Sequence, residues 1–167
     1  MGNNPSQFQG CPDCPVEKIS WNEIQDYLSK LNQQTRKAYR LPTEAEWENA
    51  CRGGAEGQRY CGGDNPDRLA WYDDNSGFKT HPVGQKTVNS FGLYDMSGNV
   101  WEWTCSTYNK GYGGAEQECT KKSTDGPLSV RGGGWSNRPT GVRSAYRYWL
   151  DPAGRFTNTG FRLARSL

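Results

Sequence analysis

The chain has 167 residues and a formal net charge of +2, with acidic and basic residues interspersed. This balance gives no broad basic face and so no basis for nucleic-acid binding or attraction to an anionic membrane. No apolar run reaches the length of a membrane span, and residues 1–10 lack a hydrophobic signal region, so no membrane insertion is expected. Length and composition predict one soluble domain over residues 1–167.

Aromatic side chains are expected to supply the core. Only 33% of residues are hydrophobic, but the chain contains seven Trp, nine Tyr and five Phe. A few large rings must therefore provide most of the buried apolar area. The 21 Gly and nine Pro residues follow no period, which indicates many turns and short, irregular segments.

The chain contains six cysteines: Cys11, Cys14, Cys51, Cys61, Cys105 and Cys119. An even number suits three disulfides in an oxidising compartment, as in a secreted or cell-surface protein, but assigns neither pairs nor compartment. CPDC also resembles half of a zinc site, yet such a site needs four ligands and His81 is the only histidine. We interpret CPDC as a loop staple and His81 as a hydrogen-bonded turn residue.

Two segments are predicted to form helices, because each opens with a capping box. Ser20 and Glu23 open the first, SWNEIQDYLSKLNQ, in which apolar residues recur at helical spacing. Thr43 and Glu46 open the second, LPTEAEWENACRGG, which stops at Gly53. Short strands are predicted near SVRGGGW, VRSAYRYW and TGFRLAR.

Four motifs, in order, resemble those of the formylglycine-generating enzyme family, also called the sulfatase-modifying factor family. They are YRLPTEAEWENACRGG, NSFGLYDMSGNVWEW, RGGGW and GFRLAR, and the resemblance covers about Pro15 to Leu167. It implies an α+β, C-type-lectin-like fold with two helices, small twisted antiparallel sheets and many loops. Members usually begin with further strands before the proline–valine segment, so the N-terminal strands are expected to be truncated here.

The resemblance also implies a structural calcium site in FGLYDMSGNVWEW. Its ligands would be the side chains of Asp95 and Glu102 and the backbone oxygens of Gly98 and Val100. Carboxylate and carbonyl oxygens suit this hard cation, and a glycine lets the backbone turn toward it. Alternatively, the two acids cap turns or pair with arginines such as Arg131.

The chain matches the motifs that imply the fold but lacks the metal ligands that the family's enzymes use. Members that oxidise a sulfatase cysteine to formylglycine use two cysteines shortly after the RGG motif to bind copper and activate oxygen. Here RGGGWSNRPTGVRSAYR contains no cysteine, which leaves no thiolate for cuprous ion. The related iron-dependent sulfoxide synthases need histidines, and the chain has one. An oxidase or accessory tailoring enzyme is therefore the alternative to a non-catalytic domain.

Arginine and aromatic residues gather between residues 136 and 159, and such residues dominate recognition hot spots. We expect an exposed face here that binds a protein or other macromolecule. Its predicted members are Asn137, Arg138, Thr140, Tyr146, Tyr148, Trp149 and Phe156. Internal packing is the alternative reading of this cluster, and Arg143 and Arg162 are expected to support the core, with Ala145 facing it.

Residues 136–160 contain no Lys, Glu, Gln, Met or His. This pattern resembles the variable proteins of diversity-generating retroelements, which share the lectin-like fold and diversify adenine-containing codons in their C-terminal segment. Mutated asparagine codons never encode Trp, so Trp149 would be an undiversified position. The sequence therefore favours a non-catalytic binding domain, with a structural module of a larger assembly as a further alternative.

Overall fold

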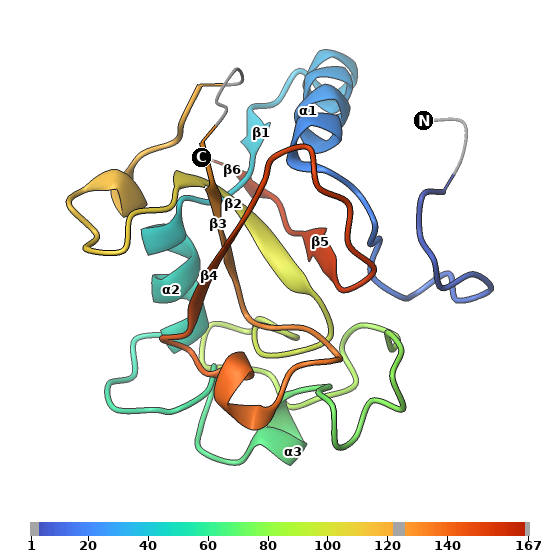
Figure 1. Ribbon diagram of the computed structural model, residues 1–167, viewed down its shortest axis with the longest axis vertical. Helices are drawn as coiled ribbons and strands as arrows, with labels where there is room; N and C mark the ends of the chain where they lie inside the picture. Colours follow the sequence, from blue (N-terminus) through green and yellow to red (C-terminus); the bar gives the residue numbers. More distant parts are fainter. Residues whose placement is uncertain (1–3, 122–125, 166–167) are drawn as a thin grey trace.

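The computed structural model describes residues 4–121 and 126–165. Four of its strands form a central sheet, and the helices lie around it, with long connections between the elements (Figure 1). In chain order they are α1 (Trp21–Thr35), β1 (Tyr39–Arg40), α2 (Glu44–Arg52), α3 (Pro66–Leu69), β2 (Trp101–Thr107), η1 (Ala115–Gln117), β3 (Leu128–Arg131), η2 (Pro139–Val142), β4 (Arg147–Leu150), β5 (Thr159–Phe161) and β6 (Ala164–Arg165).

Both predicted helices form, and both capping boxes are present. The Ser20 hydroxyl accepts the Glu23 N–H, and the Glu23 carboxylate accepts the Ser20 N–H. Thr43 and Glu46 form the same pair of hydrogen bonds at the start of α2. These bonds satisfy backbone donors that a helix leaves free in its first turn. Helix α2 ends as predicted at Gly53, whose φ of 58° lies in the left-handed region.

The central sheet has the strand order β4–β3–β2–β5, and β1 pairs with β6 in a separate two-stranded sheet (Figure 1). Strands β2, β3 and β4 pair antiparallel, whereas β2 and β5 run parallel. The α+β class is confirmed, and the larger sheet is mixed rather than wholly antiparallel. Within the described chain, no helix is long and apolar enough to cross a membrane.

The core is aromatic, as the composition predicts. Trp21, Trp47 and Trp103 are almost completely buried. The indole N–H of Trp21 donates to the Thr104 carbonyl at 3.0 Å, and that of Trp103 donates to the Ile19 carbonyl at 3.1 Å. These bonds let the polar edge of each ring be buried without an unpaired donor.

Strand β2 is not among the strands predicted from the sequence, although WEWTCS alternates apolar and polar residues. Both faces of this strand are buried. On its polar face, the Thr104 hydroxyl donates to the Ser129 carbonyl at 2.9 Å, and the Ser106 hydroxyl donates to the Glu118 carbonyl at 2.9 Å. Internal hydrogen bonds replace water along this face, so a polar stripe is accommodated inside the protein.

The six cysteines form the disulfides Cys11–Cys14, Cys51–Cys61 and Cys105–Cys119. The loop-staple interpretation of CPDC is thereby confirmed. His81 stacks on the Trp71 ring with centroids 3.8 Å apart, and its Nε2 lies 2.7 Å from the Ser76 carbonyl. It is hydrogen-bonded, as predicted, but it lies in the connection just before a turn rather than in the turn itself.

Candidate ligand-binding surface

Strand β4 forms one edge of the central sheet and presents two large aromatic side chains to solvent. Tyr148 is 46% exposed and Trp149 is 49% exposed. Their rings stack with centroids 6.2 Å apart and an interplanar angle of 14°, and the buried Trp101 lies 5.8 Å behind Tyr148. Tyr148 packs against a buried ring and Trp149 stacks on Tyr148, so the rotamers of both side chains are restricted and the entropy cost of using them in recognition is lowered.

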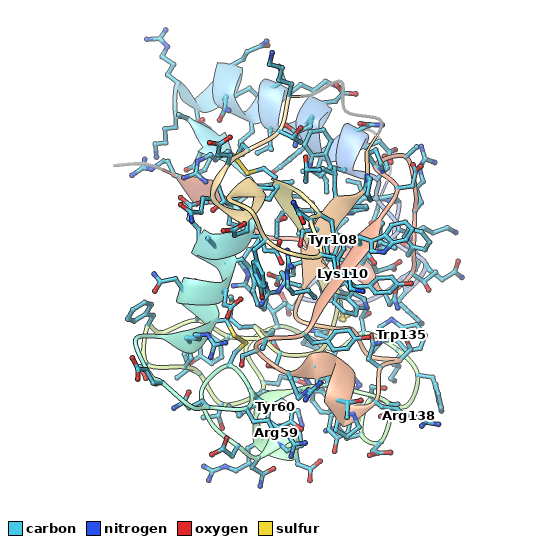
Figure 2. All side chains as sticks on the ribbon, turned by 60° about the vertical axis from the view of Figure 1, so that its left-hand side comes forward. Arg59, Tyr60, Tyr108, Lys110, Trp135 and Arg138 are labelled. Atoms are coloured by element: carbon cyan, nitrogen blue, oxygen red, sulfur yellow. A yellow bond between two sulfur atoms is a disulfide. The ribbon has the colours of Figure 1, made fainter. Side chains whose placement is uncertain are left out.

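The segment before β4 adds polar groups to the same region. Arg138 and Thr140 are exposed at the start of η2, and Figure 2 labels Arg138 beside this short helix. The preceding glycine turn backs onto Trp101, since a Cβ atom on Gly134 would lie 3.4 Å from the indole. The same buried ring therefore supports this turn and Tyr148. We call Arg138, Thr140, Tyr148 and Trp149 the ligand face.

Two other predicted members of the face have internal contacts. Asn137 is half-buried, and its Oδ1 accepts the Gly134 N–H at 2.9 Å, which closes the turn. Tyr146 is half-buried and packs against the main core, with its ring 6.0 Å from that of Trp101. Both residues support the ligand face from below rather than extend it.

Phe156 is 38% exposed but lies on the connection between β4 and β5. Its backbone carbonyl accepts the Lys18 N–H at 2.9 Å, near the beginning of α1. Within the described residues, its ring forms no aromatic pair with Tyr148 or Trp149. We therefore place Phe156 outside the ligand face.

The expected strand VRSAYRYW begins only at Arg147, because residues 139–146 form η2 and a turn. The prediction that Ala145 faces the core is wrong: this residue is exposed. Strand alternation does not apply inside a turn, which is the physical reason for the error. Arg143 lies half-buried in this turn, where its Nε donates to the Thr140 carbonyl at 2.9 Å.

Arg147 fixes the base of β4. Its Nε and Nη2 donate to the two carboxylate oxygens of Glu44 at 2.5 and 2.7 Å, and its guanidinium lies 3.9 Å from the Tyr112 ring centroid. Arg131, which is completely buried, donates to Glu44 at 2.9 Å and to Glu48 at 2.8 Å. Burial raises the pKa of Glu44, but hydrogen bonds and charge from the two arginines outweigh burial and hold this pKa below its ordinary value.

The acidic residues assigned to calcium line another cleft. Asp95, Val100 and Glu102 border a cavity of 410 Å³. Asp95 Oδ2 accepts the Gly84 N–H at 2.7 Å, whereas its Oδ1 is buried without a partner among the described residues. Burial raises the pKa of Asp95, and the nearby Glu102 charge raises it further. The unpaired oxygen fits a cation ligand.

Glu102 fits that site less well, because both of its oxygens are already bound. Arg162 donates to them at 2.5 and 2.6 Å, and the Trp47 indole N–H donates at 2.6 Å. The arginine partner of Glu102 is thus Arg162 rather than Arg131. Gly98 has φ 78°, and a Cβ atom there would lie 2.3 Å from the Trp71 carbonyl, so packing alone requires glycine. Calcium binding stays a prediction.

One cleft was not anticipated from the sequence. Residues 57–59, the connection after β2 and residues 143–147 enclose a cavity of 480 Å³ beside β4. Figure 2 shows Tyr108 and Lys110 over β4, with Arg59 below it. The run YNKGYGG offered one signal, an exposed cation between two tyrosines, but only the fold brings it to Arg59.

The mixed sheet and the helices around it define a C-type-lectin-like domain whose edge strand exposes two aromatic side chains. The structure resembles that of Treponema denticola variable protein 1, with a TM-score of 0.89 and 29% identity over 99% of this chain and 78% of that chain. The profile of the sulfatase-modifying factor enzyme 1-like domain matches residues 1–167, so the chain belongs to this family.

Two curated relatives have different described roles. The chain is 30% identical to chaperone protein LppX of Paenibacillus barcinonensis, over 99% of this chain and 74% of that protein. It is 32% identical to the formylglycine-generating enzyme of Thermomonospora curvata, over 92% of this chain. The match spans 56% of that enzyme. Membership of the family therefore does not assign an activity.

Proposed function

We propose that this chain is a non-catalytic binding domain that recognises a protein ligand through the ligand face. The observation that carries the proposal is the pair of stacked, half-exposed rings of Tyr148 and Trp149 on an edge strand. Aromatic and arginine side chains contribute most of the energy at many protein interfaces. A soluble domain has no folding reason to expose two such rings side by side.

The chemistry of the cysteines supports a binding role over oxidation. All six cysteines are disulfide-bonded, and none lies between residues 131 and 147. A cuprous site needs soft thiolate ligands, which this part of the chain does not supply. The likeness to a variable protein supports the same conclusion.

We extend the proposal to how the face arises. Residues 136–160 lack Lys, Glu, Gln and Met, which asparagine codons diversified at their adenines do not encode. Tyr148 would then be a varied position, while Trp149 would be constant. A near-identical template repeat should lie nearby in the genome, and it should carry adenine at the codon positions where its sequence differs from that of this segment. Absence of such a repeat would limit the proposal to an undiversified binding domain.

Selection from a library of displayed peptides and small folded domains tests the ligand face. Clones enriched on the wild-type domain should lose binding to Tyr148→Ala/Trp149→Ala by about 2 kcal/mol or more. The same variant should keep its free energy of unfolding within about 0.5 kcal/mol per substitution, because both rings are half-exposed.

Tyr146→Ala is the matched control, since this half-buried ring packs against the core. We expect it to lower the free energy of unfolding by about 3 kcal/mol, toward the lower end for a large aromatic side chain. Enriched clones that bind the Tyr148→Ala/Trp149→Ala variant as tightly as wild type would contradict the proposed function.

A further inference from the structure

The 480 Å³ cleft beside β4 has a lining of unusual charge. Five cationic residues and no acidic residue line it, although the whole chain carries a net charge of only +2. We call this cleft the basic pocket and define it by Arg59, Lys110, Arg143, Tyr108 and Tyr112, together with the neighbouring lining residues. Concentration of one sign of charge in a cleft raises the local concentration of ions of the opposite sign.

Acidic residues of the chain neutralise only two of the five cations. Arg147 and Arg52 bind Glu44 and Glu48 behind the pocket. The remaining three cations, Arg59, Lys110 and Arg143, form no ion pair within residues 4–121 and 126–165. Asp64 accepts the Arg59 backbone N–H at 2.8 Å, and this contact leaves the guanidinium unpaired.

The pocket wall is held in place before any ligand arrives. Ser144 joins two of its segments, because its N–H donates to the Arg59 carbonyl at 3.0 Å and its hydroxyl donates to the Gln58 carbonyl at 3.1 Å. Arg147, from the same segment as Ser144, donates from Nη1 to the Asn109 carbonyl at 2.9 Å and so ties that segment to the connection after β2. A wall that is already ordered loses little entropy on binding.

The wall also contains an acceptor. Gln58 Oε1 is buried and has no hydrogen-bond partner among the described residues. Sulfate and the dianion of a phosphate monoester offer acceptors alone and would leave this oxygen unpaired. A peptide offers carboxylates for the cations and, once the Gln58 side chain turns toward the pocket, backbone N–H groups for the amide oxygen.

From this combination we infer that the basic pocket binds an acidic segment, rich in Asp or Glu, of the protein ligand. The pocket continues directly into the ligand face, because Tyr146 and Arg147 line the pocket and Tyr148 and Trp149 follow them on β4. The inference rests on the proposed function. It adds the charge of the ligand and the place where that charge is bound.

A hexaglutamate peptide flanked by glycines is the probe, with the hexaglutamine peptide of the same length as its control. Calorimetry at low salt should show hexaglutamate binding at least tenfold tighter than hexaglutamine. Added salt should weaken the binding, because exposed charges are screened. Equal binding of the two peptides would overturn the inference.

Charge reversal locates the site. Lys110→Glu and Arg143→Glu should each weaken hexaglutamate binding at least tenfold, whereas Lys30→Glu on the exposed face of α1 should leave it within twofold. Thermal unfolding of each variant checks that the fold is retained. Binding unchanged in both pocket variants would place the peptide elsewhere and overturn the inference. A short single-stranded DNA that binds more tightly than hexaglutamate would overturn it in favour of phosphate recognition.

The two proposals fail separately. If library clones depend on Trp149 but hexaglutamate does not bind, the ligand face stands and the acidic-segment inference falls. If hexaglutamate binds through Lys110 but no clone depends on Tyr148 or Trp149, the pocket stands and the proposed use of the ligand face falls.

Discussion

Arg147 and Glu44 form a bidentate ion pair that joins the edge strand β4 to the first turn of α2, with N–O distances of 2.5 and 2.7 Å. The side chain of Glu44 is 1% exposed and that of Arg147 is 9% exposed. The residues lie 103 positions apart. This pair holds the strand that carries Tyr148 and Trp149, so it connects stability of the fold with the geometry of the ligand face.

Glu44→Gln is expected to lower the free energy of unfolding by about 3–5 kcal/mol, because it leaves buried arginine charge uncompensated. Urea unfolding measures the change. Arg155→Ala is the control: Arg155 pairs with Glu23 on the surface, and losing that pair should cost at most about 1 kcal/mol. Equal losses in the two variants would show that the Arg147–Glu44 pair does not hold the fold together.

The same pair predicts acid sensitivity. The pKa values of Glu44 and Glu48 are lowered in the folded protein by hydrogen bonds and charge from the arginines, which outweigh the effect of burial. Stability from these groups is complete above the unfolded-state pKa of about 4.3 and is lost as the pH falls through the lowered folded-state values. The free energy of unfolding, measured from neutral pH downward, should fall in this range. In Glu44→Gln it should depend less on pH. The same pH dependence in wild type and Glu44→Gln would contradict a stabilising role of the Glu44 carboxylate.

Elements that depend on residues close together in the sequence could be predicted, and those that depend on distant residues could not. The capping boxes at Ser20 and Thr43 act within four residues, and both helices could be predicted from them. The conformation of residues 139–146 could not be predicted in this way. Pro139 starts a short helix that runs into the beginning of VRSAYRYW, whose apolar residues suggest a strand.

Partners distant in sequence are harder to predict. Glu102 is bound by Arg162, 60 residues away, and the basic pocket combines Arg59, Lys110 and Arg143 from three separate connections. Composition could indicate that arginine and aromatic residues form a surface, as Tyr148 and Trp149 do. It could not separate these exposed rings from the supporting Tyr146, because one turn changes which side chains face outward.

Calcium binding can be tested at Asp95, whose pKa is raised by burial and by the nearby Glu102 charge. A raised folded-state pKa means that stability falls as the pH rises from the unfolded-state value through the folded-state value. Without calcium at neutral pH, Asp95→Asn should therefore unfold at a higher temperature than wild type.

With calcium at a hundredfold excess over its Kd, wild type should gain about 2.7 kcal/mol and Asp95→Asn should gain little. Melting curves with calcium and with chelator give both results. Glu102→Gln is unsuitable alone, because loss of the Arg162 contact should destabilise the fold whether or not calcium binds. Wild-type curves that coincide with calcium and chelator would leave Asp95 as a buried turn residue.

The non-catalytic assignment predicts that the purified domain, incubated with cuprous ion, oxygen and a sulfatase-motif peptide, forms no aldehyde. The physical reason is the supply of thiolate: every cysteine is in a disulfide, and residues 131–147 contain none. Copper oxidation of the peptide needs soft ligands at the reacting centre. The Thermomonospora curvata enzyme, a relative at 32% identity, serves as the positive control for the assay.

The incubation should be repeated with a thiol reductant, because reduction releases up to six thiols, including Cys11 and Cys14 near the surface. Mass spectrometry of the peptide should show no formylglycine in either condition, since none of these cysteines lies in the segment next to the ligand face. Aldehyde formed without reductant would overturn the non-catalytic proposal outright. Aldehyde formed only after reduction would also overturn it, and Cys→Ser variants of each disulfide would then identify the thiols responsible.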